Sequence, residues 1–194
     1  RYMSRHGGRG VARVALVSSV VPYMLQTDDN PDGVPQATFD QMTDGMLEDR
    51  AKFMTSFFKD FYGVGWISQP VSDEALELSW ATAMMAGLRP TLAAARAFAT
   101  TDFRPDLPAF TVPTLVIHGT ADKTVPIEAT GRAVARAVPQ STLIEYDGEP
   151  HGVFATQTER LKRNLLDFLA GREPDDRQDV LDAMTASAMV TPPV

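Results

Sequence analysis

Two polar loops late in the chain carry side chains suited to acid–base chemistry. Asp122 comes shortly after the apolar run Thr114–His118, and His151 comes shortly after the next such run, Thr142–Tyr146. A carboxylate that accepts a hydrogen bond from one ring nitrogen of a histidine fixes its tautomer, and the other nitrogen is left to take a proton from a serine hydroxyl. Asp122 and His151 are therefore predicted to be the acid and base of a serine–histidine–aspartate triad.

A triad also needs a nucleophile, and no serine in the chain has the expected surroundings. When the chain order is serine, acid, histidine, the serine lies on a sharp turn with the sequence G-x-S-x-G. None of the nine serines has a glycine two residues before it and another two residues after it. They are Ser4, Ser18, Ser19, Ser56, Ser68, Ser72, Ser79, Ser141 and Ser187. Because the chain begins with arginine rather than methionine, we expect the nucleophile to lie upstream of Arg1.

The acid has alternative readings. Asp122 could cap the backbone of its own turn, which is a common role for aspartate in such a position. Asp147 and Glu149 could also partner His151, but they lie too close to it in sequence for their carboxylates to approach the imidazole from the opposite side. We rank Asp122 ahead of both.

The other two histidines are expected to be structural. His118 ends an apolar run directly before Gly119, where we expect it to make a hydrogen bond near the acid turn. His6 lies among arginines at the end of a helical segment, where a solvated side chain is the ordinary finding.

Composition narrows the class of protein. A chain of 194 residues with 44% hydrophobic residues can bury the core of one domain. A net charge of -7 argues against a nucleic-acid partner and leaves small neutral or acyl substrates open. The absence of cysteine excludes a disulfide scaffold or a thiolate nucleophile. No signal peptide or long apolar run is seen, so we expect a cytoplasmic location without membrane attachment.

One segment has the appearance of a metal site. Asp28-Asp-Asn-Pro-Asp-Gly33 matches the first six positions of a calcium loop. The twelfth position, however, is Phe39 instead of a bidentate glutamate, and Pro31 lies inside the loop. We read the segment as an acidic surface turn, and we expect neither a metal nor an organic cofactor.

The first part of the chain reads as a helix end followed by a strand. Residues 1–6 are expected to close a helix at Gly7-Gly8, because glycine accepts the left-handed conformation of a C-cap. Val11–Val20 is nearly all apolar, which is typical of a strand buried on both faces of a parallel sheet. The polar residues 26–35 form a loop.

Three helices are predicted next. Apolar residues recur every three to four positions from Gln36 to about Phe61. Ser72 caps a helix that reaches about Ala86, and Pro90 begins another that reaches about Phe98. Residues 102–113 are expected to be loop. The aromatic and methionine side chains of these helices are expected to be mostly core, with a few lining an apolar acyl pocket.

Strands and helices then alternate. We expect strands at Thr114–His118 and Thr142–Tyr146, with helices at Ile127–Ala137 and Thr156–Leu169. This order predicts a parallel sheet. The rest of the chain reads as a charged tail with one short helix at residues 179–189.

Together these elements predict an α/β protein with three parallel strands, flanking helices and an inserted helical lid, from which the first strands are missing. The segments are residues 1–25 (helix end and core strand), 26–111 (lid and connecting loops), 112–170 (closing βαβα part) and 171–194 (tail). A buried parallel strand needs neighbours on both sides, so the strand at Val11–Val20 would leave an open edge.

The chain resembles the cofactor-free haloperoxidase, perhydrolase and arylesterase branch of the α/β-hydrolases over roughly residues 1–169. The resemblance rests on the combination of several segments. They are Arg1-Tyr2, Val11–Val20, Thr27–Pro31, Phe58–Gly63, Thr101–Phe103 with Asp106-Leu107, Val112–Gly119, Asp122 with Val125-Pro126, and Pro150–Gly152.

The resemblance implies that Asp122 is the triad acid and His151 the general base, while the serine elbow and the oxyanion donors precede Arg1. It also implies a small ester, carboxylic acid or peroxide as substrate, and an acyl-enzyme that water or hydrogen peroxide resolves without haem or metal. The chain by itself is then expected to be inactive. A non-catalytic fragment that binds a partner, or a second copy, through the open sheet edge is the alternative.

Overall fold

The computed structural model describes residues 1–174, which form two compact units. The first, Arg1–Thr156, contains the three strands and both predicted triad residues. The second begins at Gln157 and contains helix α7 (Thr158–Leu169). The short helix predicted at residues 179–189 lies outside the described residues. Within residues 1–174, no helix combines the length and the apolar character needed to cross a membrane.

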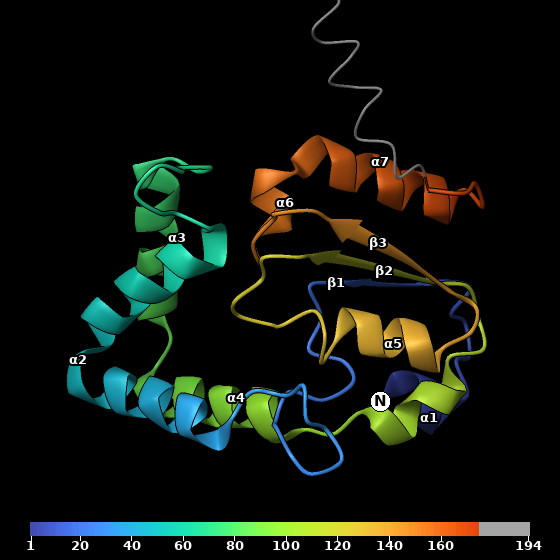
Figure 1. Ribbon diagram of the computed structural model, residues 1–194, viewed down its shortest axis with the longest axis horizontal. Coiled ribbons are helices and arrows are strands. Elements are labelled where there is room, and N and C mark those ends of the chain that lie inside the picture. Colours follow the sequence, from blue (N-terminus) through green and yellow to red (C-terminus); the bar gives the residue numbers. More distant parts are fainter. Residues whose placement is uncertain (175–194) are drawn as a thin grey trace, which may run out of the picture. The chain divides into compact units, whose positions relative to one another are not determined.

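A parallel sheet of three strands organises the first unit (Figure 1). Its order is β1 (Val14–Val17), β2 (Thr114–Gly119) and β3 (Ser141–Tyr146), and both pairs are parallel. β2 has a strand on each side and is buried throughout, as its continuous apolar sequence predicts. The parallel arrangement expected from the alternating sequence is thus observed in this part of the chain.

Helix α5 (Gly131–Ala137) covers one face of the sheet (Figure 1). Val134 and Val138 form a buried cluster with Val116 of β2, and Leu16 and Leu143 pack against that cluster. The apolar residues of three strands and one helix therefore share one core, which fixes the ends of β2 and β3 relative to each other.

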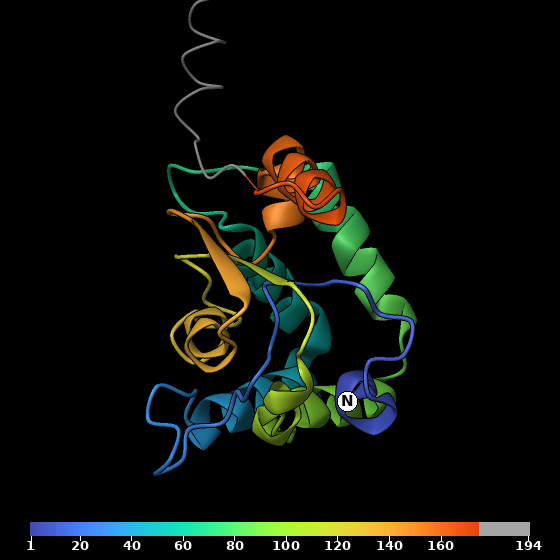
Figure 2. The same cartoon turned by 90° about the vertical axis from the view of Figure 1, so that its right-hand side faces the viewer.

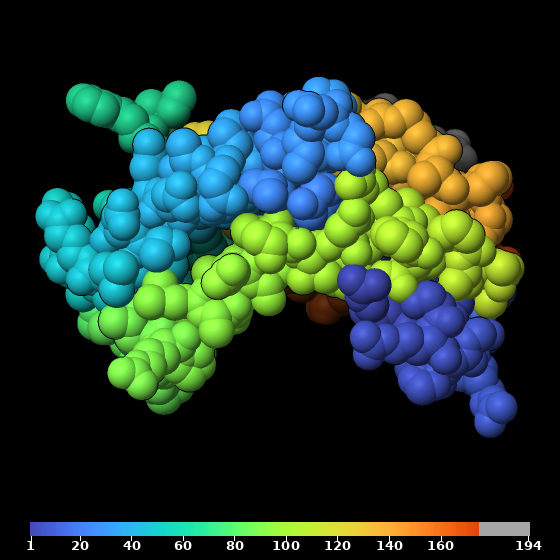
Figure 3. Space-filling view, turned by 90° about the horizontal axis from the view of Figure 1, so that it is seen from below, coloured from blue at the N-terminus to red at the C-terminus, as the bar shows by residue number. Residues whose placement is uncertain are grey.

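Three helices lie between β1 and β2 in the chain: α2 (Gln36–Tyr62), α3 (Asp73–Met85) and α4 (Leu88–Thr100). They lie on the side toward which the carboxyl ends of the strands point (Figure 1). α2 and α4 run side by side along one face of the molecule's first unit (Figure 3). α2 bends at Asp49, whose backbone is not helical (φ -150°, ψ 88°), a bend that the sequence pattern did not indicate.

The amino-terminal helix α1 (Tyr2–His6) packs against a short 3-10 helix, η1 (Arg104–Ala109) (Figure 2). Gly7 follows α1 in the left-handed conformation, so the predicted C-cap is confirmed. Arg1 joins the two segments by an ion pair of 2.9 Å with the buried Asp106. η1 itself was not expected, because residues 102–113 carried no helical signal.

Several predicted boundaries were wrong. β1 covers Val14–Val17 instead of Val11–Val20, since the chain leaves the sheet at Ser18, whose φ is 43°. β1 is also only partly buried, because β2 is its single neighbour among the described strands. The aromatic side chains of this region were expected to be mostly core, but Trp66 is fully exposed in the loop between α2 and α3.

Helix boundaries moved for backbone reasons. α5 begins at Gly131 instead of Ile127, because Thr130 has a non-helical backbone (φ -127°, ψ -90°). The single helix predicted for Thr156–Leu169 is two helices, α6 (Val153–Thr156) and α7, which a non-helical Gln157 separates. α4 begins at Leu88, two residues before Pro90.

Candidate active site

The acid turn lies directly after β2. Asp122 Oδ1 accepts hydrogen bonds from the backbone N–H groups of Thr124 (2.9 Å) and Val125 (2.7 Å). A carboxylate that takes two N–H groups from its own turn holds that turn in one conformation. The turn-capping role considered for Asp122 is therefore present, but it occupies only one of the two carboxylate oxygens.

The histidine loop follows β3 and lies against the acid turn. Thr120 N–H donates to the Tyr146 carbonyl and Ala121 N–H donates to the Glu149 carbonyl, each at 3.0 Å. Gly119 permits this approach, because a Cβ at that position would lie 2.2 Å from the Glu149 carbonyl oxygen. The two loops are thus joined backbone to backbone at the carboxyl ends of neighbouring strands, where open α/β sheets bind their ligands.

The contact between these loops joins the two predicted triad residues. His151 Nδ1 lies 2.7 Å from Asp122 Oδ2. The Asp122 side chain is fully buried, and the His151 side chain is 17% exposed. With its proton on Nδ1, His151 keeps Nε2 for proton transfer. The structure therefore brings together the pair that the sequence predicted, and their catalytic roles remain predictions.

Asp122 is held in its ionised form. Burial, the largest single influence, raises the pKa of this carboxyl, but hydrogen bonds from His118 and His151 lower it. The charge of His151 and the backbone N–H of Val125 lower it further, so the net pKa lies below its ordinary value. A carboxylate at neutral pH is the form that can stabilise an imidazolium.

His118 makes the hydrogen bond that was expected of it near the acid turn. Its ring is fully buried, and Nε2 lies 2.8 Å from the Val125 carbonyl oxygen. Nε2 also lies 3.2 Å from Asp122 Oδ2. The second contact was not predicted; the spacing of four residues between His118 and Asp122 is the signal that could have suggested it.

Two further segments contact the histidine loop. The Phe61 ring at the end of α2 meets the His151 ring edge to face, with centroids 4.6 Å apart, and the Phe61 carbonyl accepts the Gly152 N–H at 2.8 Å. Ser18 Oγ donates to the His151 carbonyl at 3.0 Å. Ser18 follows β1 just as Asp122 follows β2, so its place at the strand's carboxyl end could have been inferred.

The remaining candidates make other contacts. Asp147 accepts a hydrogen bond from Thr120 Oγ1 (3.2 Å), and Glu149 accepts one from Thr156 Oγ1 (2.6 Å). The His6 ring is exposed and lies against the Tyr2 ring, with centroids 4.8 Å apart.

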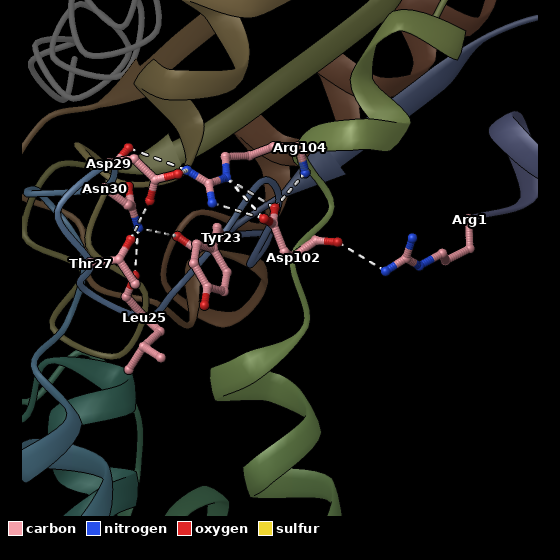
Figure 4. A network of polar contacts seen from close by, with 8 residues as sticks. All are labelled: Arg1, Tyr23, Leu25, Thr27, Asp29, Asn30, Asp102 and Arg104. Carbon is pink, nitrogen blue, oxygen red and sulfur yellow. Dashed lines mark hydrogen bonds and ion pairs between the residues drawn. The ribbon is translucent and has the colours of Figure 1, made fainter.

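The loop that resembled the start of a calcium site is held by its own polar contacts (Figure 4). Asn30 Nδ2 donates to the carbonyl oxygens of Tyr23 and Leu25, and Asp29 forms an ion pair of 3.1 Å with Arg104. Hydrogen bonds from Arg104 lower the pKa of Asp102. In residues 1–174 no three acidic, histidine or cysteine side chains gather as ligands for a metal ion.

An apolar cavity of about 300 Å³ lies between α2 and α4 and reaches the acid turn. Its lining includes Met42, Met46, Phe53, Phe57, Phe98 and Thr124. Thr124 belongs to the turn that Asp122 caps, and Phe57 is one helical turn before Phe61. The cavity therefore extends to the acid turn at Thr124 and to the part of α2 one turn before Phe61.

Comparison with known proteins finds a match to the alpha/beta hydrolase fold and similarity to non-heme haloperoxidases and an esterase. The family model described as alpha/beta hydrolase fold matches residues 1–158. The chain is 36% identical over 171 residues to the non-heme chloroperoxidase CPO-A1 of Kitasatospora aureofaciens. This alignment covers 87% of this chain and 62% of the relative. It is 34% identical over 169 residues to the bifunctional esterase/perhydrolase DCH of Acinetobacter calcoaceticus, covering 87% of this chain and 61% of the relative.

A solved structure is also similar to this chain. The bromoperoxidase from Bacillus anthracis superposes with a TM-score of 0.80 at 34% sequence identity, covering 87% of this chain and 62% of that one. The chain therefore spans about three fifths of the length of the proteins that it matches.

Proposed function

This chain belongs to the alpha/beta hydrolase fold family, and from that premise we propose that it carries the acid and the base of a serine acyl-transfer site. The observation that carries the proposal is the 2.7 Å contact between His151 Nδ1 and Asp122 Oδ2, made by two loops that follow neighbouring parallel strands. The serine nucleophile and the oxyanion donors come from a segment outside these 194 residues.

The chemistry follows from the geometry of the pair. His151 Nε2 takes the proton of the serine hydroxyl as its oxygen attacks the carbonyl carbon of a small ester, and Asp122 stabilises the resulting imidazolium. The imidazolium then returns the proton to the leaving alcohol, and an acyl-enzyme remains. Water resolves it to a carboxylic acid, whereas hydrogen peroxide resolves it to a peracid, which can oxidise halide.

The open edge of the sheet is consistent with an additional segment that pairs with β1. β1 is an edge strand of the described sheet and is only partly buried, although its sequence is apolar. We propose that the first strands of the fold pair with this edge and that α2, α3 and α4 form the lid over the site. The share of each relative that the chain leaves unmatched is consistent with a segment of this kind.

The cavity between α2 and α4 favours an apolar acyl group. Its lining is almost wholly apolar, and it begins at Thr124 next to the acid turn. Pockets of this size and lining bind small apolar groups and leave orientation to a few polar groups at one end. We propose that the acyl chain or aryl ring of the substrate occupies it.

A fusion protein tests the proposal directly. The part of the Acinetobacter relative that this chain does not match is placed ahead of Arg1, and hydrolysis of p-nitrophenyl acetate is measured. We expect turnover that His151→Ala lowers at least about 10³-fold, because the base is lost. His6→Ala, at an exposed histidine, is the matched control and keeps full turnover. Equal turnover in the His151→Ala fusion would contradict the proposal.

The unfused chain provides the complementary measurement. Without a nucleophile the covalent step is lost, so we expect no ester hydrolysis above the buffer rate. Turnover of the unfused chain that disappears in His151→Ala would contradict this expectation.

A second candidate function follows from the open edge of β1: a non-catalytic module that binds a partner strand there. The two candidates differ in the fusion experiment. A docking module gains no turnover when the unmatched segment is added, whereas an incomplete enzyme does.

A further inference from the structure

His118 lies behind the proposed pair and contacts the same carboxylate oxygen that His151 uses. Its Nε2 is 3.2 Å from Asp122 Oδ2, and His151 Nδ1 is 2.7 Å from that atom. We infer that His118 is a positioning residue for the proposed pair, one that shares Asp122 Oδ2 with His151 and so limits the strength of the hydrogen bond between His151 and Asp122. The inference rests on the proposed function and concerns how its base is adjusted.

The surroundings of the His118 ring determine which nitrogen carries the proton. Nε2 faces two oxygens, the Val125 carbonyl at 2.8 Å and the Asp122 carboxylate, so it must be a donor. Nδ1 is buried and has no hydrogen-bond partner within residues 1–174. The neutral form protonated at Nε2 therefore satisfies the contacts that this ring makes.

Gly131 at the start of α5 holds the ring in place. A Cβ at that position would lie 2.9 Å from His118 Nδ1 and 3.2 Å from its Cβ and Cγ. The backbone of α5 thus packs directly against the imidazole, and a side chain there would push the ring. The direction of the Nε2–H donor is consequently set by helix packing as well as by its acceptors.

Four nitrogens surround the Asp122 carboxylate, two near each oxygen. Oδ1 accepts the backbone N–H groups of Thr124 and Val125, whereas Oδ2 lies 2.7 Å from His151 Nδ1 and 3.2 Å from His118 Nε2. A carboxylate offers about four lone-pair sites, one for each of these nitrogens. Removing His118 leaves the Oδ1 contacts intact, so the carboxylate keeps its orientation, and His151 becomes the single side-chain donor on Oδ2.

Loss of the His118 donor should therefore strengthen the hydrogen bond from His151 Nδ1–H to Asp122 Oδ2. Less of the carboxylate charge is then dispersed over other donors, and a carboxylate with more concentrated charge is a stronger acceptor. The substitution leaves other charged groups unchanged: Glu145 on β3 interacts with His118, and Asp60, Lys123 and Glu149 line a neighbouring cavity.

Nitrogen and proton NMR of the chain can test the inference without any turnover. The chain has three histidines, and His118 is identified by its loss from the spectrum of a variant. His118→Leu removes the donor, whereas His118→Gln keeps an N–H near the Nε2 position. We expect the His151 Nδ1 proton resonance to move downfield in the leucine variant, because its hydrogen bond to Asp122 is strengthened, and to stay near its original position in the glutamine variant. An unchanged resonance in folded His118→Leu, or equal shifts in both variants, would overturn the inference.

Gly131→Ala gives a second route if the leucine variant does not fold. This change keeps every donor but pushes the His118 ring away from its place, so we expect a smaller downfield shift of the His151 Nδ1 proton. No change in Gly131→Ala would overturn the inference as well. The readout also separates the two proposals. If His151 of the unmodified chain carries no proton on Nδ1, the aspartate–histidine pair and the proposed function fail; if it does and His118 has no effect, this inference alone fails.

Discussion

Asp122 shows that one side chain can serve two purposes at the residue scale. Its Oδ1 closes the acid turn with two backbone N–H groups, and its Oδ2 faces His151. The structural and the catalytic readings of this aspartate are therefore compatible. Because the turn already fixes the carboxylate, the proposed reaction would not have to orient it.

The ionisation of Asp122 should appear in the pH dependence of stability. Its pKa is lowered from 3.8 in the folded chain, so its stabilising contribution is present above pH 3.8 and is lost as the pH falls through the lower folded value. We expect Asp122→Asn to lower the free energy of unfolding by about 1–3 kcal/mol at pH 7, because a buried carboxylate loses acceptor contacts. In urea unfolding, the difference in the free energy of unfolding between wild type and Asp122→Asn should become smaller below pH 3.8.

Asp28→Asn is the matched control, since Asp28 is exposed in its turn. It should change stability by less than about 0.5 kcal/mol. A gap between wild type and Asp122→Asn that does not vary with pH would argue against an ionised acid.

At the scale of elements, the site depends on how closely two loops approach each other. β2 and β3 are neighbours in register, so the acid turn and the histidine loop begin at the same edge of the sheet. Gly119 then lets the backbones touch, and the Gly152 N–H bonds to the Phe61 carbonyl at the end of α2. Packing of α2 and pairing of the strands are therefore both needed to place His151.

Gly119→Ala should be severely destabilising. The new Cβ would lie 2.2 Å from the Glu149 carbonyl oxygen and 2.6 Å from that of Pro150, and backbone atoms cannot rotate out of the way. We expect a loss of about 3 kcal/mol or more in the free energy of unfolding, measured with urea. Gly65→Ala is the matched control, because a Cβ there meets no atom within 4 Å, and it should stay near wild type. Comparable stability of the two variants would contradict the close approach.

Ser72→Ala tests the cap of α3. Ser72 Oγ accepts the Ala75 N–H at 3.2 Å, and its loss leaves that donor without its cap. We expect the free energy of unfolding to fall by about 1 kcal/mol. Circular dichroism with urea is sufficient, and an unchanged midpoint would mean that water replaces the cap without cost.

At the scale of the whole molecule, the edge of β1 is the feature with the largest consequence. The N–H groups of Val14 and Ser18 bond to the segment of β2, at 3.0 and 2.9 Å. Backbone N–H groups alternate in direction along a strand, so those of Ala15 and Val17 point away from β2. An apolar edge with outward donors favours pairing with another strand.

Association of the chain should therefore depend on that edge. We expect light scattering after size-exclusion chromatography to show self-association that increases with concentration. Ala15→Pro removes one outward N–H and should reduce self-association. Ala15→Ser keeps that N–H and should leave self-association unchanged. A compact monomer at all concentrations would argue against an available edge.

The sequence by itself determined the parts of this protein that depend on local rules. The apolar runs gave the three strands and their parallel order, Gly7 and Ser72 marked helix ends, and the spacing of Asp122 and His151 after successive strands predicted their pairing. Glycine conformations, capping side chains and alternating strands and helices are all properties of short segments, which is why they could be read without coordinates.

Tertiary structure alone decided the contacts that cross the chain. The kink of α2 at Asp49, the Phe61 ring against His151, and the hydrogen bond from Ser18 to the histidine loop have no local signature. His118 was expected near the acid turn, but its share in Asp122 Oδ2 depends on how α5 packs against its ring at Gly131. Residue spacing could have suggested that Ser18 and His118 lie near the site, but the contacts themselves depend on side-chain directions and helix packing, which only the tertiary structure sets.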